Sequence, residues 1–537
     1  MAALGEAEQV VATTDSDQGD FNEAEAPGKS DDAPFFPSDS IEELIYDDLT
    51  EADHQTLHKG TIHSIVRQTS YDSRSETPNT VDQDTPDISA GEESLEDSAE
   101  TQVNSNSISV GEQEECLDAE VEDEEDVNSP NWKNQKKHVF ILSESGKPVY
   151  SRHGHEDKLV TIMGVMQALV SFVQDSKDSL RSIVAGKHKF VFLVRDHLIL
   201  VGVTRGTDST QQMLLQLMYV YNQVISVLTH SQLSKIFKQR RNYDLRRLLT
   251  GAEKFFDNLL NLMDSEPGLL LSAVRCLPLD NQVRDIIAQT IVQNAKVKDL
   301  VFALIIAKNQ LVTLVRMKKY YLHSMDLHLI INLVNASESF KEAESWTPIC
   351  LPKFDASGYL QAHVSYLDSD CQVCLLLLSV DRDSFFTLSE CKDKIKTRLT
   401  RYNALEAIDS SLRRKSYSTQ QCGITDLRHF LYKARSTAQY TSPELEAPYC
   451  LPGEDERLFG MYQYLHHRIH TSGRPLKILF HVGQYETLLG WVTQGFELYA
   501  VFGPLVTKTG AIHAVNKLLR WIKREEDRLF ILNSPTF

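Results

Sequence analysis

The sequence predicts an α+β protein in which one arrangement, an antiparallel sheet with flanking helices, occurs three times behind an acidic tail. Short apolar strands come in pairs that are separated by turns of two or three residues. Helices whose apolar residues recur every three or four positions follow these pairs. The same order of elements begins again near residues 297 and 425, although the three rounds share almost no identical residues. Strands and helices in this order favour antiparallel sheets covered by helices.

Residues 1–130 differ sharply in charge from the rest of the chain. They hold 36 acidic and 4 basic side chains, a net charge of −32, whereas the other 407 residues hold 39 acidic and 51 basic side chains, a net charge of +12. The segment has few aromatic residues and no sustained hydrophobic period, so burial cannot offset its chain entropy. We therefore expect a disordered acidic tail. Thr77, Thr85 and Ser129 each precede a proline in it and are candidate phosphorylation sites.

The first folded unit begins near residue 136. Its expected elements are strands at 138–142 and 147–151, a helix over 159–173, strands at 190–194 and 198–204, and a helix that carries Leu214, Leu217, Tyr221, Val224, Ile225 and Leu228 on one face. The first helix should bury Leu159, Ile162, Met163, Met166, Leu169, Val170 and Val173. Thr207 or Asp208 can cap the second helix. We expect both helices on one side of the sheet.

A largely helical connector follows and includes a capped segment from Asp280. The second unit should contain strands at 300–306, 311–317, 359–366 and 373–380, with helices over 325–334 and 384–401. The third should contain a strand within RHFLYKAR, a helix over 454–470, strands within 476–502 and a helix over 508–526.

No motif of covalent catalysis is present. The chain lacks a phosphate-binding P-loop, a G-x-G-x-x-G turn, a G-x-S-x-G nucleophile elbow and an H-E-x-x-H helix. Cys371 and Cys374 have the spacing of a zinc or redox pair, but they open an apolar strand without a second pair, so we interpret them as strand residues. His466 and His470 could ligate a metal if a carboxylate faced them. Without one nearby in sequence, we interpret them as part of a polar helix face and expect no metal and no cofactor.

A basic segment lies at the start of the helical connector, which runs from about Leu233. It contains Lys235, Lys238, Arg240, Arg241, Arg246 and Arg247. A cluster of this size can be attracted to anionic lipid, and the alternative is an ordinary solvated helix face. We expect no binding to nucleic acid, because no aromatic stacking platform accompanies these residues. Ser416 follows Arg413-Arg414-Lys415 and is a candidate site for a basophilic kinase.

The eight cysteines are scattered, and the first residues, MAALGEAEQV, lack the layout of a secretory signal. The longest apolar runs fall well short of the roughly 20 residues that a bilayer span needs. We expect a cytoplasmic protein that visits membrane surfaces.

Several strings, in order through all three units, resemble one family. They are KHVFILSESGKPVYSRHG, GVMQALVSF, NYDLRRLL, WTPICLPKF, DLRHFLYKA, SPELEAPY and KREEDRLFIL. Together they are similar to the Mon/SAND family of vacuolar fusion proteins over about 136–537. The resemblance implies three longin domains, each a five-stranded antiparallel sheet flanked by helices, at 136–250, 297–405 and 425–537, with a helical connector at 251–296 and a linker at 406–424.

The resemblance also implies a function. Members of the family pair with a CCZ-type subunit, also built from three longin domains, and the dimer is a guanine nucleotide exchange factor for a late-endosomal Rab GTPase. Such a complex promotes endosome maturation, fusion with the lysosome or vacuole, and clearance of autophagosomes. It would be recruited peripherally to late endosomes and lysosomes through anionic phosphoinositides. Exchange needs no catalytic acid or base, because it depends on tighter binding of the nucleotide-poor GTPase.

In the family the GTPase sits on the paired first longin domains. Carried over to this chain, the candidate contact residues are Lys147, Tyr150, Lys158, Met163, Met166 and Gln167. The alternative is a non-catalytic adaptor or tether that binds a GTPase or a SNARE, because longin domains serve both purposes. A metal-dependent hydrolase that uses Cys371, Cys374 and the helix histidines is a third class. It would require stoichiometric zinc in the purified protein, and we expect none.

Overall fold

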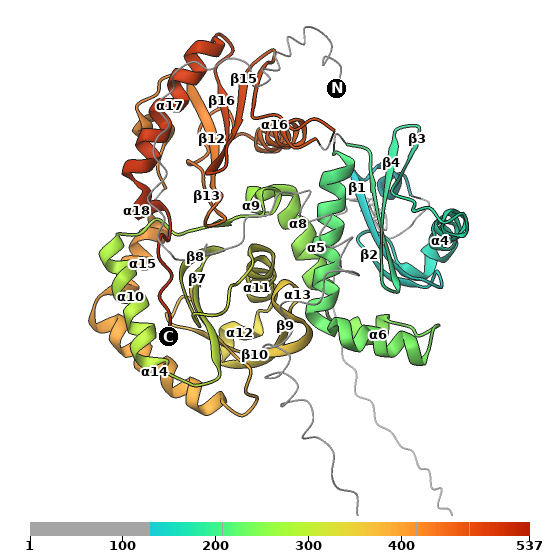
Figure 1. Ribbon diagram of the computed structural model, residues 1–537, viewed down its shortest axis with the longest axis horizontal. Coiled ribbons are helices and arrows are strands. Elements are labelled where there is room, and N and C mark those ends of the chain that lie inside the picture. Colours follow the sequence, from blue (N-terminus) through green and yellow to red (C-terminus); the bar gives the residue numbers. More distant parts are fainter. Residues whose placement is uncertain (1–128, 207, 415, 472) are drawn as a thin grey trace, which may run out of the picture.

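The structure of this chain is a computed structural model that describes residues 129–206, 208–414, 416–471 and 473–537. Thr77, Thr85 and the expected tail before residue 129 lie outside the described residues. Three sheets with their helices surround the connector, whose helices α8 and α9 lie near the middle of the molecule (Figure 1). The α+β class and the threefold order of elements are confirmed.

The first domain is built on an antiparallel sheet with the strand order β2-β1-β5-β4-β3. The strands are β1 (Lys137–Ser143), β2 (Pro148–Ser151), β3 (Ser182–Ala185), β4 (His188–Arg195) and β5 (Leu198–Thr204). A short helix, α3 (Pro130–Asn134), precedes them. The sequence did not predict β3, because three of its four residues are exposed and lack the apolar pattern of a buried strand.

Helices cover both faces of this sheet, so our expectation of helices on one side was wrong. α4 (Val160–Asp175), preceded by a 3-10 turn at Glu156–Leu159, packs over Phe140 and Leu142. α5 (Thr210–Leu228) packs on the opposite face over Val139 and Ile141. Successive side chains of a strand point to opposite faces, so a strand covered on both faces is apolar throughout. The unbroken apolar run of β1 is the sign of this arrangement.

α5 begins at a capping box that the sequence placed one or two residues too early. The Ser209 hydroxyl accepts from the Gln212 backbone N–H at 3.1 Å, and the Gln212 side chain accepts from the Ser209 N–H at 3.0 Å. Asp208 is instead buried, and its carboxylate accepts from the Thr204 hydroxyl at 3.0 Å. Thr207 lies outside the described residues.

The connector links all three domains. Its elements are α6 (His230–Gln239), α7 (Arg246–Leu249), α8 (Glu253–Ser265), α9 (Pro267–Leu271), β6 (Val274–Arg275) and α10 (Asn281–Asn294). Asp280 caps α10, as predicted, by accepting from the Gln282 N–H at 2.8 Å. The core of the first domain continues through α8 to Met325 and Cys350 of the second domain. α5 is therefore buried on nearly every side.

The second sheet has the order β8-β7-β11-β10-β9. Its strands are β7 (Leu300–Ala307), β8 (Gln310–Arg316), β9 (Ser345–Leu351), β10 (Ala356–Tyr366) and β11 (Val373–Ser379), and its helices are α11 (Ser324–Ala336), α12 (Ser339–Glu342), α13 (Pro352–Asp355), α14 (Phe385–Arg401) and α15 (Ala404–Arg413). α11 packs on one face, and α10 and α14 pack on the other. The sequence did not predict β9 or α15, and α15 extends into the segment expected as a linker.

The third sheet has six strands, in the order β14-β15-β16-β12-β13-β6. The domain comprises a 3-10 turn (Thr419–Cys422), β12 (Leu427–Ala434), β13 (Gln439–Thr441), α16 (Glu454–Ile469), β14 (Ile478–Val482), β15 (Thr487–Val492), β16 (Phe496–Phe502), α17 (Lys508–Arg524) and α18 (Glu526–Leu529). The sixth strand is β6 of the connector, which pairs in parallel with β13. Cys276, next to β6, bridges Leu311 of β8, so this segment joins the edges of two sheets.

Candidate functional site

The outer face of α4 carries an apolar stripe that nothing covers in the described part of the chain. Val165, Leu169 and Phe172 lie one helical turn apart, and they are 57%, 41% and 75% exposed. We expected Leu169 to be buried, and this was wrong. The inward face holds the buried residues Met163, Met166 and Val170. α4 is thus apolar on both sides, which is typical of a helix that a second partner covers.

The candidate GTPase-contact residues divide into exposed and buried groups. Lys147 is exposed on the turn into β2, and its ammonium donates to the Asn242 carbonyl at 2.7 Å. Lys158 is exposed in the 3-10 turn before α4. Gln167 is half-buried on α4 and donates to the Ser171 hydroxyl at 2.8 Å. The turn at Gly146, which has a φ of +78°, lies against the Gln167 side chain, because a Cβ atom at Gly146 would be 3.4 Å from the Gln167 Cβ.

Met163, Met166 and Tyr150 cannot form part of a contact surface in this conformation. Both methionines lie in the core between α4 and the sheet. Tyr150 is buried between β2 and the connector, where its hydroxyl donates to Asp257 and its ring packs against Phe256. Burial raises the pKa of the Tyr150 hydroxyl well above its ordinary value, because the anion would lose its hydration. These three residues instead belong to the core of the first domain and its contact with the connector.

A polar pocket of about 260 Å³ lies beside α4, at the ends of β1 and β4. Its charged residues come from three separate turns. Glu144 lies 3.3 Å from the His197 ring and 3.5 Å from the Arg241 guanidinium. Asp196 accepts from Tyr221 and lies 3.3 Å from His230. The hydrogen bond to His230 holds the pKa of Asp196 below its ordinary value. Gln167 also lines this pocket, which therefore offers donors and acceptors next to the apolar stripe.

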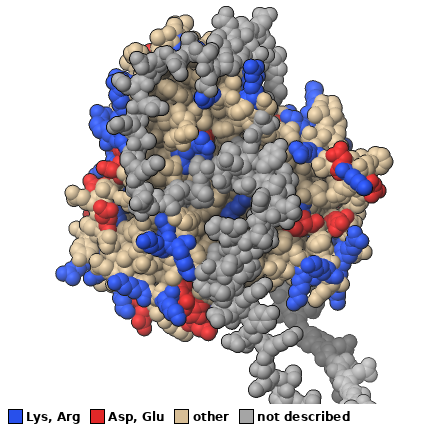
Figure 2. Space-filling model, in the orientation of Figure 1, with Lys and Arg blue, Asp and Glu red and all other residues tan. Residues whose placement is uncertain are grey.

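The basic segment is partly neutralised within the chain. Arg246 pairs with Asp157 at 2.7 Å and with Asp244 at 3.2 Å, and Arg241 pairs with Glu144. The other four residues are exposed and have no ion pair within the described residues: Lys235, Lys238, Arg240 and Arg247. Leu233 and Phe237, on the inner side of α6, are buried. Figure 2 shows Lys and Arg side chains gathered at the lower right of the molecule, the region of α6 in Figure 1.

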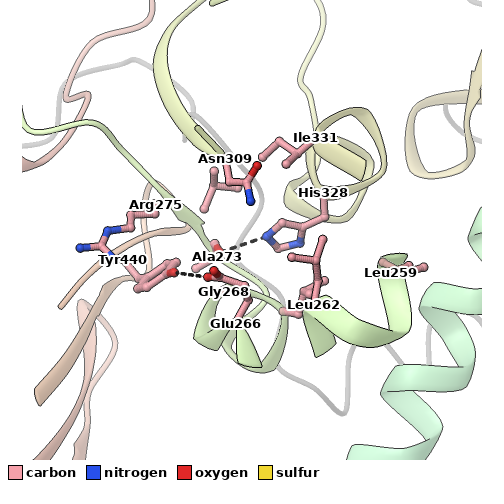
Figure 3. Close-up of a pocket in the computed structure, with 12 residues that line it drawn as sticks. Leu259, Leu262, Glu266, Gly268, Ala273, Arg275, Asn309, His328, Ile331 and Tyr440 are labelled. Atoms are coloured by element: carbon pink, nitrogen blue, oxygen red, sulfur yellow. Dashed lines mark hydrogen bonds between the residues drawn. The ribbon is translucent and has the colours of Figure 1, made fainter. Parts of the chain in front are cut away.

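A small cavity marks the point where the connector meets the second and third domains (Figure 3). His328 of α11 lies 2.9 Å from the Tyr219 hydroxyl and 3.2 Å from the Ala273 carbonyl, and Tyr440 donates to Glu266. Burial lowers the pKa of His328 to about 4, so the ring is neutral at pH 7. With a volume of about 40 Å³, the cavity has room for water but not for an organic ligand. It is a packing junction.

The cysteine and histidine pairs differ from their sequence interpretations. Only Cys374 lies on a strand, whereas Cys371 lies in the preceding turn with a φ of +50°. His466 is buried, so the interpretation as a polar helix face is wrong for this residue. A carboxylate does face the histidines: the ligand atoms of His466, His470 and Glu497 lie within 4.8 Å of one another. No local pattern pointed to Glu497, because it lies on a strand 27 residues beyond His470.

Two candidate phosphorylation sites fall within the described residues. The Ser129 hydroxyl caps α3 by accepting from the Trp132 N–H at 3.1 Å. The Ser416 N–H donates to Glu444 at 2.8 Å, and its hydroxyl oxygen is closed off from solvent. A kinase could reach Ser416 only after this segment moved.

No helix in the described part of the chain has the length and apolar character to cross a bilayer.

Comparisons with known proteins identify the family. Profiles of the first, second and third longin domains of FUZ, MON1 and HPS1 match residues 137–259, 298–397 and 426–526. The chain is 54% identical over 415 residues to vacuolar fusion protein MON1 homolog A of Gallus gallus. These aligned residues make up 77% of this chain and 75% of that protein. It is 52% identical to protein SAND of Takifugu rubripes (77% and 79%) and 42% identical to vacuolar fusion protein MON1 homolog B of Homo sapiens (77% and 78%). The three domains described above are therefore longin domains, and the chain belongs to the MON1/SAND family of vacuolar fusion proteins.

Proposed function

We propose that this chain is one subunit of a heterodimeric guanine nucleotide exchange factor for a late-endosomal Rab GTPase. Its partner is a CCZ-type subunit with three longin domains. The observation that carries the proposal is the apolar stripe of α4 at Val165, Leu169 and Phe172, which no other described residue covers. An exposed apolar face on an otherwise well-packed domain favours a stable protein interface. The class of partner is the one that the resemblance to the Mon/SAND family implies, and membership of that family is consistent with it.

The GTPase would bind beside this interface, where Lys147, Lys158 and the polar pocket lie. Exchange requires only that the dimer bind the nucleotide-poor GTPase more tightly than the loaded form. Exposed lysines and an array of amide, carboxylate and imidazole groups can compete for the polar contacts of a switch loop. No acid or base is needed, which agrees with the absence of catalytic motifs from the sequence.

Recruitment to late endosomes and lysosomes would use the cations of the basic segment that form no ion pair within the described residues. Lys235, Lys238, Arg240 and Arg247 can approach an anionic phosphoinositide surface without first breaking an ion pair to another described residue. In this way the complex would promote endosome maturation, fusion with the lysosome or vacuole, and autophagosome clearance.

The test is release of a fluorescent nucleotide from a panel of Rab GTPases by the co-purified dimer. We expect acceleration for a late-endosomal Rab. Lys147→Glu with Lys158→Glu should slow release without changing dimer assembly, whereas Lys396→Glu, on the exposed side of α14, should leave the rate unchanged. Tight GTPase binding without acceleration would replace the proposal with its alternative, a non-catalytic longin adaptor or tether.

A further inference from the structure

We propose that His466, His470 and Glu497 form a binding site for a divalent transition-metal ion, of which zinc is the best match, within the third longin domain. The ligand atoms of these residues lie within 4.8 Å of one another. His470 Nε2 and Glu497 Oε2 are already 3.4 Å apart. Two ligands bound at about 2.0–2.1 Å to a tetrahedral zinc ion are separated by roughly 3.4 Å. The ligand atom of His466 completes this group of three.

The fold creates the site by bringing the end of α16 unusually close to the sheet. Gly490 of β15 makes this approach feasible, because a Cβ atom there would lie 2.3 Å from the Ile469 side chain. Gly490 pairs with Tyr499 of β16, whose side chain packs under α16. Glu497 lies two residues before Tyr499 on the same strand, so its side chain points to the same face of the sheet. His466 and His470 are one helical turn apart and project onto that same face. Their rings are 4.5 Å apart.

Two of the ligands are held in the protonation state that metal binding requires. Burial lowers the pKa of His466 well below its ordinary value, which keeps this imidazole neutral. Burial by itself would raise the pKa of Glu497, but the ammonium of Lys433, which pairs with its carboxylate, helps to hold that pKa well below its ordinary value. Neutral imidazole and ionised carboxylate are the forms that donate electron pairs to a metal.

The cations around Glu497 contact one carboxylate oxygen, and His470 lies near the other. Lys433 donates to Oε1 at 3.1 Å, and Arg435 lies 3.6 Å from the same atom. Oε2 instead faces His470 and accepts from the Tyr499 hydroxyl at 3.1 Å. In metal sites a ligating carboxylate is itself oriented by hydrogen bonds to its other oxygen. Lys433 and Arg435 would have this role, although their charge also weakens the affinity for a dication.

The simpler interpretation is a buried ion pair. Lys433 and Glu497 lie opposite each other in the β12–β16 register and neutralise each other without a metal. That pair accounts for Oε1, but it does not require two histidines at helical spacing beside Oε2. The site is also accessible, because the side chain of His470 is 18% exposed. Two imidazoles and a carboxylate suit zinc and leave a fourth position for water or the Tyr499 hydroxyl. The ion would tie α16 to β16.

Zinc binding to the full chain, purified without a polyhistidine tag and stripped with chelator, tests the site. Competition with a chromophoric chelator would give the stoichiometry and affinity, and thermal unfolding with and without zinc would give the stabilisation. We expect one tight equivalent of zinc and a higher melting temperature in its presence. His470→Asn should weaken binding at least tenfold and abolish the stabilisation. His467→Asn, the adjacent histidine on α16, should retain both.

Cobalt substitution provides a second readout that does not depend on stability. Intense visible d–d bands would indicate a site with four or five ligands, and their loss in Glu497→Gln would assign the carboxylate. Failure of the wild-type chain to bind zinc above the level of nonspecific surface histidines would overturn the proposal. So would equal zinc binding by the wild type, His470→Asn and His467→Asn, since the bound metal would then be adventitious.

Discussion

The ammonium of Lys137 on β1 lies 2.9 Å from the Asp264 carboxylate on connector helix α8. Lys137 is 9% exposed and Asp264 is 41% exposed. Gln216 of α5 accepts from the same ammonium at 3.1 Å, and Arg152 pairs with the other Asp264 oxygen at 2.8 Å. Burial alone would raise the pKa of Asp264, but Lys137 and Arg152 outweigh it and keep that pKa below its ordinary value. This network attaches the first domain to the connector.

Lys137→Met should therefore destabilise the chain by roughly 2 kcal/mol, because it leaves a partly buried carboxylate without its main partner. Thermal unfolding at pH 7 measures the change. A double-mutant cycle with Asp264→Asn should give a coupling of about 1 kcal/mol or more. The control is Lys136→Met at the neighbouring position. Lys136 pairs with Glu456, and because the two side chains are 83% and 66% exposed, this ion pair should contribute little to stability. Equal effects of the two lysine substitutions would contradict this account.

Phe172→Asp should abolish binding to the CCZ-type partner while leaving the melting temperature of the chain nearly unchanged. The Phe172 ring is 75% exposed, so its replacement removes no core contact but places a charge in the proposed interface. Co-purification and thermal unfolding measure the two effects. Val170→Ala, on the buried side of α4, should show the opposite behaviour, with a loss of about 2 kcal/mol and retained binding. A normal complex with Phe172→Asp would exclude α4 as the interface.

Lys235→Glu with Lys238→Glu should weaken binding to anionic vesicles by at least roughly tenfold. Each lysine close to such a surface contributes about 1 kcal/mol, and the reversed charges add repulsion. Vesicle sedimentation at increasing salt gives the affinity, which should fall as the charges are screened. The pair Lys394→Glu and Lys396→Glu on α14 is a matched control that should bind as the wild type does. Binding that does not respond to salt would count against the basic segment as the lipid-binding surface.

The stability of the domain junction should fall as the pH decreases from 7 to 5. Burial lowers the pKa of His328 from 6.5 to about 4, so the unfolded chain binds a proton in this range that the folded chain does not. The stabilisation is complete above pH 6.5 and is lost as the pH falls towards 4. His328→Gln, which can still accept from Tyr219 and donate to Ala273, should lose less stability over the same range, by roughly 1–2 kcal/mol after allowance for partial solvation.

Chemical denaturation of both proteins at several pH values tests the effect of His328. His513→Gln, an exposed histidine on α17, should follow the wild-type pH dependence. If the wild type and His328→Gln lost stability in parallel, the junction histidine would not be the titrating group.

Most elements follow from local patterns, and the exceptions have physical causes. The hairpins of β1 with β2 and β7 with β8, and helices α4, α5, α14 and α17, lie where apolar spacing predicted them. β3 was not predicted, because it is an exposed edge strand whose residues show no alternation of apolar and polar side chains. Of the six candidate GTPase residues, Lys147, Lys158 and Gln167 are accessible. Met163 and Met166 are not, because an apolar period cannot tell which face of α4 meets its own sheet. Tyr150 is not, because connector helix α8, more than 100 residues away in sequence, packs over it.

The sequence by itself determined the acidic tail, the order of strands and helices, the resemblance to the vacuolar fusion family and the absence of catalytic motifs, because these depend on composition and on residues near one another in the chain. Only the tertiary structure decided that helices cover both faces of the first sheet, that Phe172 remains uncovered and that Glu497 meets His466 and His470. Those relationships arise when segments far apart in sequence pack together. A helical or strand period carries no record of which distant residue will lie opposite.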